Sequence, residues 1–215
     1  MEKRGLQYQL RGKNMDKDKL VKKGLRLEYF TVSYNFLEAI VAILFGSIAS
    51  SIALIGFGMD SIVETLSGFV LIWRLNQHQD LTEEEEERIE KKAMKFVAIT
   101  FFILGTYVLI QSVLKLIDGT PPDPSLPGII LAFVSIIIMP LLAYQKIKVG
   151  KQIDSGALVA DAKETVACAF LSVALLLGLG LNYLFGLWQA DPIVGFIIVF
   201  FLFREGRESW EEAHE

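Results

Sequence analysis

The sequence contains few residues that break helices or cross-link a fold. Its 215 residues include six prolines, two histidines and a single cysteine, Cys168. One cysteine excludes an intramolecular disulfide, so cysteine gives no indication of an oxidising compartment. The histidines, His78 and His214, fall outside the long apolar segments, and we interpret them as surface residues. The N-terminus does not resemble a secretory signal peptide, because basic residues continue to Arg26 and no small-residue cleavage site follows.

Charged residues are almost absent from several long stretches. The chain is 53% hydrophobic and 21% charged, with a net charge of −4, but the charges lie in separate blocks. The stretches between the blocks reach the roughly 20 apolar residues that a membrane-spanning helix needs. We predict an all-α, polytopic membrane protein with six transmembrane helices, in a cell (inner) membrane. The expected spans are about 28–48, 52–75, 93–116, 126–146, 156–181 and 191–204.

The spans divide the chain into three predicted parts. A basic cytoplasmic segment covers 1–27, the transmembrane domain covers 28–205, and a short cytoplasmic tail covers 206–215. Glu83 to Glu87 are expected to form the acidic first turns of the third span. Pro140 is expected to bend the fourth span. Asp191 followed by Pro192 predicts the start of the sixth, with the aspartate as its N-cap.

Lysine and arginine are distributed very unevenly between the two sides. Of 21 such residues, nine lie at or before Arg26, five lie between Arg74 and Lys95, and five more lie in the 4–5 connection and at the C-terminal end. This count assigns Lys146 to the connection between the fourth and fifth spans. Only Lys115 falls on the other side, and Lys163 lies inside the fifth span. The positive-inside rule therefore predicts that both termini are cytoplasmic.

Ionisable side chains occur inside only three of the predicted spans. They are Glu38 in the first, Asp60 and Glu64 in the second, and Asp161, Lys163, Glu164 and the Cys168 thiol in the fifth. Charges inside a membrane are costly, so they usually face a cavity and serve a function. Asp60 and Glu64 are four residues apart and share one helix face. Asp161, Glu164 and Cys168 are spaced i, i+3 and i+7, which also places them on one face.

The depths of these residues indicate which would meet. Counted from Arg74, Asp60 is about 21 Å deep and Glu64 about 15 Å deep. Counted from Lys151, Glu164 is about 20 Å deep and Asp161 about 15 Å, with Cys168 about a turn further. We therefore expect Asp60 level with Glu164, and Glu64 level with Asp161. Several carboxylates that close cannot all stay ionised without a cation. A metal ion or protons would neutralise them, which is the requirement for metal–proton exchange.

Structural roles remain open for several of these residues. Glu38 and Lys163 can equally form a buried ion pair. Cys168 taken alone is more typical of a packing residue than of a ligand. Lys163 points about 100° away from Glu164 on a helix, so we do not expect it in the site. The paired acids of the second and fifth spans have few structural uses in mid-membrane, and for them we favour a functional site.

The sequence at this point resembles the cation diffusion facilitator (cation efflux) family. The segment from Ser51 to Glu64 is similar to that family's helix-two pattern D-x-x-x-D, with Glu64 in the second aspartate position. Residues 160–168 resemble the helix-five pattern A-D-x-x-H-x-x-x-D, with Glu164 in the histidine position and Cys168 in the last aspartate position. Because the chain stops about ten residues past the sixth span, the similarity is to transmembrane-only members without a C-terminal cytoplasmic domain.

The resemblance implies a secondary transporter, not an enzyme, that exports a divalent cation in exchange for protons. Zn²⁺ is favoured, and Mn²⁺, Co²⁺, Cd²⁺ or Fe²⁺ are alternatives. The implied metal ligands are Asp60, Glu64 and Glu164, with Asp161, Cys168 and Glu38 as further candidates. The metal is substrate, and no prosthetic group is expected.

A homodimer in membrane lipid is implied, with spans three and four as its surface and no nucleic-acid partner. The alternative is a non-transporting membrane partner that dimerises and keeps at most a structural metal.

Overall fold

Long apolar runs fold into helices because a backbone in lipid must satisfy its polar groups internally. The computed structural model describes residues 2–77, 83–153 and 155–214. It consists of six helices: α1 (Glu2–Ala49), α2 (Ile52–Gln77), α3 (Glu83–Asp118), α4 (Leu126–Ile153), α5 (Gly156–Phe185) and α6 (Ala190–Glu212). Each predicted span lies within one of them, and α3 begins at Glu83 as expected. Pro140 lies inside α4, which continues to Ile153.

The helices have the length and hydropathy of a multi-pass membrane protein. Five of them, α1 to α5, are long and apolar enough to cross a membrane. The sixth, α6, is apolar only in its first half, and it packs closely along α3. The prediction of an all-α polytopic membrane protein is confirmed. No break separates the basic N-terminal segment from the first span, because α1 continues through both.

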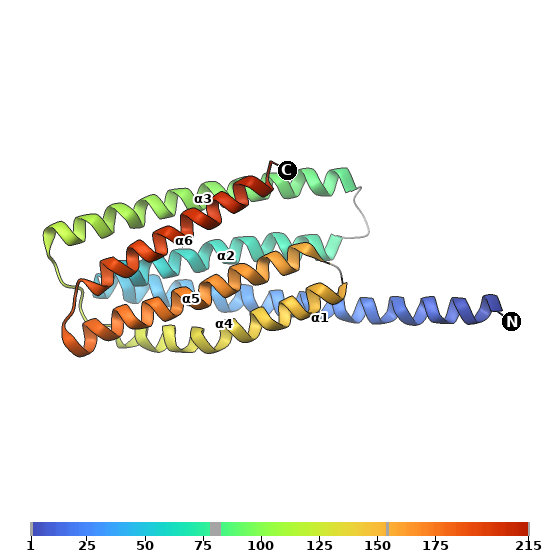
Figure 1. Ribbon diagram of the computed structural model, residues 1–215, viewed down its shortest axis with the longest axis horizontal. Coiled ribbons are helices and arrows are strands. Elements are labelled where there is room, and N and C mark those ends of the chain that lie inside the picture. The colour runs from blue at the N-terminus through green and yellow to red at the C-terminus, as the bar shows by residue number, and fades with distance from the viewer. Residues whose placement is uncertain (1, 78–82, 154, 215) are drawn as a thin grey trace.

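Three helix pairs pack most closely, α1 with α2, α4 with α5, and α3 with α6. In Figure 1, the pair α3–α6 lies across one side of a bundle made by α1, α2, α4 and α5. Both chain termini lie toward the same end, which we call the termini end. The opposite end, called the loop end, contains the connections 50–51, 119–125 and 186–189. Which end faces the cytoplasm stays a prediction.

Glycines allow α1 and α2 to approach each other closely. A Cβ on Gly58 would lie 2.8 Å from Ile43 Cγ1, and one on Gly46 would lie 2.9 Å from Ile55 N. A Cβ on Gly68 would meet Val32 Cγ2 at 2.5 Å. These contacts leave no room for larger residues, and they fix an antiparallel register in which the numbers of facing residues sum to about 100.

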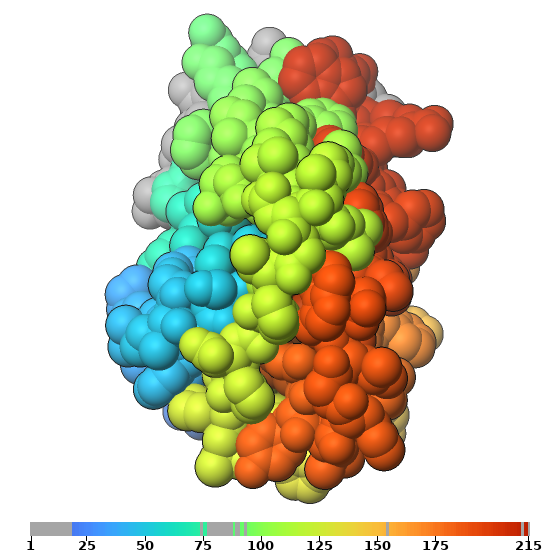
Figure 2. Space-filling view, turned by 90° about the vertical axis from the view of Figure 1, so that its left-hand side faces the viewer, coloured from blue at the N-terminus to red at the C-terminus, as the bar shows by residue number. Residues whose placement is uncertain are grey.

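The loop end is held together by Asp191, though not in the predicted way. The helix α6 begins at Ala190 after Gln189, and no side chain caps it. Asp191 instead accepts hydrogen bonds from Ile52 N at 2.9 Å and from the Ser51 hydroxyl, so it caps α2. The α3–α4 connection crosses this end between α2 and α5 (Figure 2), where Pro122 O accepts a hydrogen bond from Asn182.

Two lysines that entered the charge count as surface residues are buried. Lys115 is 7% exposed, lies 3.3 Å from Asp191 Oδ2 and donates to Ser50 O. Lys146 is fully buried between α1 and α5. The position of neither lysine indicates which side of the membrane it faces, because the charge of each is neutralised inside the protein. The other eighteen lysines and arginines counted on the predicted cytoplasmic side still predict the same orientation.

Candidate metal site

One turn of α2 and one residue of α5 form a compact group of potential metal ligands. Asp60 and Glu64 lie one turn apart on the face of α2 toward α5, and Cys168 lies opposite them. One ligand atom from each of these three residues lies within 4.8 Å of the other two. All three side chains are buried, with exposures of 8%, 5% and 1%. Among the described residues, this is the one group of three such side chains close enough to hold an ion.

The Glu64 carboxylate is the strongest sign that this group binds a cation. Both of its oxygens are buried, and neither has a hydrogen-bond partner among the described residues. A buried carboxylate without partners is costly unless a positive charge or a proton compensates it. Two carboxylates and a thiolate suit a divalent cation, with a borderline-soft metal favoured by the sulfur. The donor set therefore fits a divalent metal ion as cargo.

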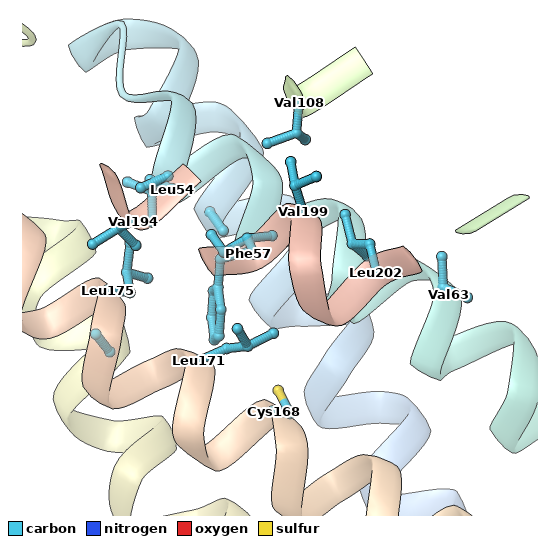
Figure 3. Packing of buried hydrophobic residues seen from close by; sticks show 14 of the residues in the cluster. Leu54, Phe57, Val63, Val108, Cys168, Leu171, Leu175, Val194, Val199 and Leu202 are labelled. Carbon is cyan, nitrogen blue, oxygen red and sulfur yellow. The ribbon is translucent and has the colours of Figure 1, made fainter. Parts of the chain in front are cut away.

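An apolar cluster closes the path from this group to the loop end. Leu54 and Phe57 of α2, and Leu171 and Leu175 of α5, lie on the loop side of Asp60 and Cys168, each at 1% exposure or less. Val194, Val199 and Ile198 of α6 join them. Figure 3 shows Cys168 at the edge of this cluster, with Leu171 and Phe57 beside it. Water and ions cannot pass through side chains packed this closely.

A pocket opens on the other side of the group, between α5 and α6. Its volume is about 650 Å³, and its lining includes Lys163, Glu164, Arg204 and Glu205. Glu164 is half-buried there, outside the group formed by Asp60, Glu64 and Cys168. Its carboxylate still interacts electrostatically with that of Glu64. Lys163 is exposed, in agreement with the prediction that it lies outside the site.

The structure pairs α2 with α5 in a register different from the predicted one. Cys168, not Glu164, lies with Asp60 and Glu64. The depth estimate started from Lys151, but α4 continues to Ile153 and α5 begins after Ser155. Counted from the helix ends at Gln77 and Ser155, Glu64 and Cys168 are both about 20 Å deep. The error arose because a lysine near a helix end was taken as the membrane boundary.

Glu38 has other partners than Lys163. Its two carboxylate oxygens accept hydrogen bonds from Ser61 Oγ at 2.9 Å and from the Ser135 hydroxyl. Tyr34 OH and Ser135 Oγ are 2.7 Å apart, so a polar group from α1, α2 and α4 surrounds this carboxylate. The ion pair between Glu38 and Lys163, which the sequence left open, does not form, since Lys163 faces the pocket between α5 and α6.

Asp161 lies in a buried ion cluster that the sequence did not reveal. Lys146 Nζ is 2.5 Å from Asp161 Oδ2 and 3.1 Å from Glu28 Oε1, and it donates to Thr165 Oγ1 at 3.3 Å. Glu28 and Lys146 are fully buried. Both fall at the very edges of predicted spans, where charges normally meet water. The available signal was a stripe on α1 of Glu28, Thr31, Asn35 and Glu38, whose spacing of 3, 4 and 3 residues indicates one helix face.

The fold and the candidate site together define a multi-pass membrane protein with a buried group of potential cation ligands between its second and fifth helices. Comparison with known proteins agrees with this class. A family model described as the cation efflux transmembrane domain matches residues 29–213. The chain therefore belongs to the cation efflux family, as the resemblance implied.

Curated relatives are similar over most of this chain. An uncharacterised transporter of Methanocaldococcus jannaschii is 27% identical over 168 residues, which is 76% of this chain and 59% of the relative. The manganese efflux system protein MneP of Bacillus subtilis is 22% identical over 77% of this chain and 59% of its own length. The magnetosome protein MamB of a Magnetospira strain is 26% identical over 62% of this chain and 47% of its own length. The chain thus spans roughly half of the relatives that it matches.

Proposed function

We propose that this protein exports a divalent metal cation, with Zn²⁺ favoured, in exchange for protons. Asp60, Glu64 and Cys168 would bind the ion. The observation that supports this most is the buried Glu64 carboxylate, whose oxygens have no hydrogen-bond partner among the described residues, beside two further potential ligands. Asp161 is left out of the ligand set because Lys146 pairs with it, and Glu38 because two serines already donate to it. Glu164 would meet the hydrated ion in the pocket.

The surroundings of the site suit alternating access. A pocket lies between α5 and α6, with Ala167 next to Cys168 in its lining, while packed apolar side chains close the site toward the loop end. Transport would require the α3–α6 pair to move against the other four helices, which would close the pocket and open the apolar cluster. Rigid-body movement around a fixed mid-membrane site is common in secondary transporters.

Proton exchange follows from the chemistry of the ligands. Carboxylates and thiols must lose their protons to bind a metal, so binding releases protons and weakens as pH falls. After the ion leaves, the same ligands recover protons from the opposite side. The net result is export of one ion against an inward movement of protons.

The ligand set favours Zn²⁺ over Mn²⁺. A thiolate stabilises zinc, cadmium or cobalt more than manganese, which prefers oxygen. Because one relative is named as a manganese efflux protein, Mn²⁺ is the main alternative. Competition between the two ions for purified protein will rank them.

Transport can be tested in vesicles that contain the purified protein. Zn²⁺ movement should depend on a pH gradient and be accompanied by a proton signal from a pH-sensitive dye. Asp118→Asn, an exposed acid at the end of α3, serves as the matched control. Protein that binds Zn²⁺ but moves neither ion would refute transport and favour a non-transporting membrane partner.

A homodimer remains part of the proposal, but its predicted surface must be revised. The helix α3 packs on α6 and α2, whereas α4 packs on α5 and α1, so they lie on different sides of the bundle (Figure 1). Both have exposed apolar faces, for example Ile103 on α3 and Ile137 on α4. Only one can form a two-fold interface. Mass measurement in mild detergent tests the dimer, and cross-linking from these two positions distinguishes the faces.

A further inference from the structure

The exposed side chains of α1 change from apolar to basic at one level along the helix. Exposed apolar and aromatic residues occur from Ile48 back to Tyr29. This stretch is about 28 Å long, close to the roughly 30 Å hydrocarbon core of a bilayer. Beyond Tyr29, toward the termini end, the next four exposed residues are all basic: Arg26, Lys23, Lys22 and Lys19.

These four basic residues share one face of α1. Their spacing of i, i+3, i+4 and i+7 places them side by side on the helix surface. The opposite face packs into the protein, where a Cβ on Gly24 would lie 3.2 Å from Leu158 Cδ2. The basic face therefore points away from the bundle.

The helix α4 lies beside α1 at this level and antiparallel to it. A Cβ on Gly24 would lie 3.6 Å from Val149 Cγ1, and Glu28 pairs with Lys146 at 3.1 Å. Figure 1 shows the end of α4 next to α1 where α1 leaves the bundle. Positions on the two helices can therefore be compared by counting from the contact between Gly24 and Val149.

The exposed side chains of α4 change in the same way and at the same level. Tyr29 and Tyr144 are each five residues from the contact between Gly24 and Val149, so these two exposed tyrosines are level. From Leu126 to Tyr144, the exposed apolar part of α4 is about 27 Å long. Beyond Tyr144, the exposed charged residues of α4 are Lys148 and Lys151. Tyrosines are enriched where the hydrocarbon core meets the headgroups, so the basic residues of both helices lie at headgroup level.

The charges on this surface have no acidic partner in the part of the chain that the structure describes. The only acid within residues 19–30 and 141–153 is Glu28, and it is buried against Lys146. No ion pair between described residues involves the five basic residues that we call the α1–α4 basic face: Lys22, Lys23, Arg26, Lys148 and Lys151.

The basic residues of α6 at the same end are arranged differently. Arg204 Nε lies 2.8 Å from Glu208 Oε1, and Arg207 Nε lies 2.7 Å from Glu211 Oε1. The chain thus neutralises these exposed arginines by itself. On the α1–α4 basic face the compensating negative charge must come from outside the chain.

We propose that the α1–α4 basic face binds the headgroups of anionic phospholipids, with their acyl chains along the exposed apolar residues of the same two helices. Basic residues next to a membrane span attract anionic lipids, and each contributes about fivefold in affinity. A free phosphate ion offers the same charge without acyl chains. The basic face continues directly into the apolar surface beyond Tyr29 and Tyr144, which favours a lipid. This inference goes beyond metal transport and does not depend on it.

Lipid binding is measured by native mass spectrometry on the delipidated whole chain in mild detergent, without added metal. The probes are phosphatidylglycerol, phosphatidylcholine with the same acyl chains, and inorganic phosphate. The α1 variant carries Lys22→Gln, Lys23→Gln and Arg26→Gln. The α4 variant carries Lys148→Gln and Lys151→Gln.

The matched control carries Arg204→Gln and Arg207→Gln, which removes two positive charges from the same end of the molecule. Each of these arginines has its own acidic partner in the chain, so its loss should not affect an external anion. Thermal unfolding in detergent shows whether each variant is folded.

The wild type should bind phosphatidylglycerol at least about tenfold more tightly than phosphatidylcholine, and added salt should reduce that preference. The α1 variant should weaken phosphatidylglycerol by about tenfold or more, and the α4 variant by about fivefold or more. The control should stay within about twofold of the wild type.

Wild-type affinity for phosphatidylglycerol in the folded α1 variant would overturn the proposal. If inorganic phosphate bound as tightly as the lipid and with the same dependence on these residues, the face would be an anion site without a lipid. Loss of a dimer in the variants, with lipid affinity unchanged, would assign the face to contact between copies of the chain. If the α1 variant does not fold, the α4 variant decides alone.

Discussion

The two halves of the protein interior on either side of Asp60, Glu64 and Cys168 are built from opposite chemistry. The half toward the loop end is apolar and closely packed, with Phe57, Leu171 and Leu175 at 1% exposure or less. The half toward the termini end contains the Lys146 cluster, the polar face of α1 and the pocket between α5 and α6, together with a smaller apolar cluster around Leu71 and Leu158. The candidate metal site lies at the boundary between them.

On the proposed function, this difference indicates which half would change during transport. In the half toward the termini end, the pocket between α5 and α6 is open to solution as it stands. The apolar half must separate before an ion can leave by the loop end, and packed interiors usually move between discrete arrangements rather than deforming continuously. Lys115 and Asp191 join α3 and α6 to the start of α2 at this end. On the proposed function, these contacts would have to shift before the apolar half opens.

The largest expected effect on transport comes from substitutions in the candidate metal site, at the boundary between the two halves. Asp60→Ala and Glu64→Ala should each abolish metal transport and lower Zn²⁺ affinity by about a hundredfold or more, a loss of roughly 2.8 kcal/mol. The protein should remain folded, because each substitution removes a buried carboxylate and leaves no charge behind. Calorimetric titration and vesicle transport measure the two effects, with Asp118→Asn as control. Normal transport by either alanine variant would place the ion elsewhere.

The next effect concerns the polar half. Lys146→Met leaves Glu28 and Asp161 buried without their cation, which should destabilise the protein by about 3–5 kcal/mol. Adding Glu28→Gln and Asp161→Asn to Lys146→Met should restore much of that loss, because no uncompensated charge remains. Thermal unfolding in detergent will show this. Equal stability of Lys146→Met and the wild type would mean that the ion cluster does not form.

A third change would make the apolar half resemble the polar one. Leu171→Asn introduces an amide beside Phe57 and Cys168, where water would have to enter to satisfy it. We expect a proton leak in metal-free vesicles, well below the rate of coupled transport but above that of empty vesicles. Leu177→Asn, on the exposed face of α5, is the control. A tight seal in Leu171→Asn would show that this layer is not what closes the site.

The smallest effect distinguishes Cys168 from Glu164. Cys168→Ser should weaken Zn²⁺ by about tenfold, or roughly 1.4 kcal/mol, and weaken Mn²⁺ less, because the lost sulfur favours zinc. Glu164→Ala should leave the affinity nearly unchanged and slow uptake, since Glu164 lines the pocket. Paired titrations with both ions test this. A larger loss of Zn²⁺ affinity in Glu164→Ala than in Cys168→Ser would instead support the arrangement predicted from the sequence, in which Glu164 lies level with Asp60.

Much of the fold could be predicted from the sequence because hydropathy is a local property. Each apolar run became a helix, and the spacing of Asp60 with Glu64 correctly indicated one face. The register between α2 and α5 could not be predicted, since it depends on where α5 begins, and Lys151 was a misleading reference. Lys146 was missed because its partner Glu28 lies on α1, far away in the sequence. Asp191 was assigned to its own helix, whereas it caps α2 by a tertiary contact.

The proposed function depends on Asp60, Glu64 and Cys168 binding the transported ion together. X-ray absorption at the zinc edge, on tag-free protein loaded with one Zn²⁺, tests it most directly. Zinc held by these residues should show one sulfur neighbour at about 2.3 Å and oxygen neighbours at about 2.0–2.2 Å. The sulfur signal should disappear in Cys168→Ser, which has no other thiol. Zinc surrounded only by oxygen or nitrogen in the wild type would contradict the account.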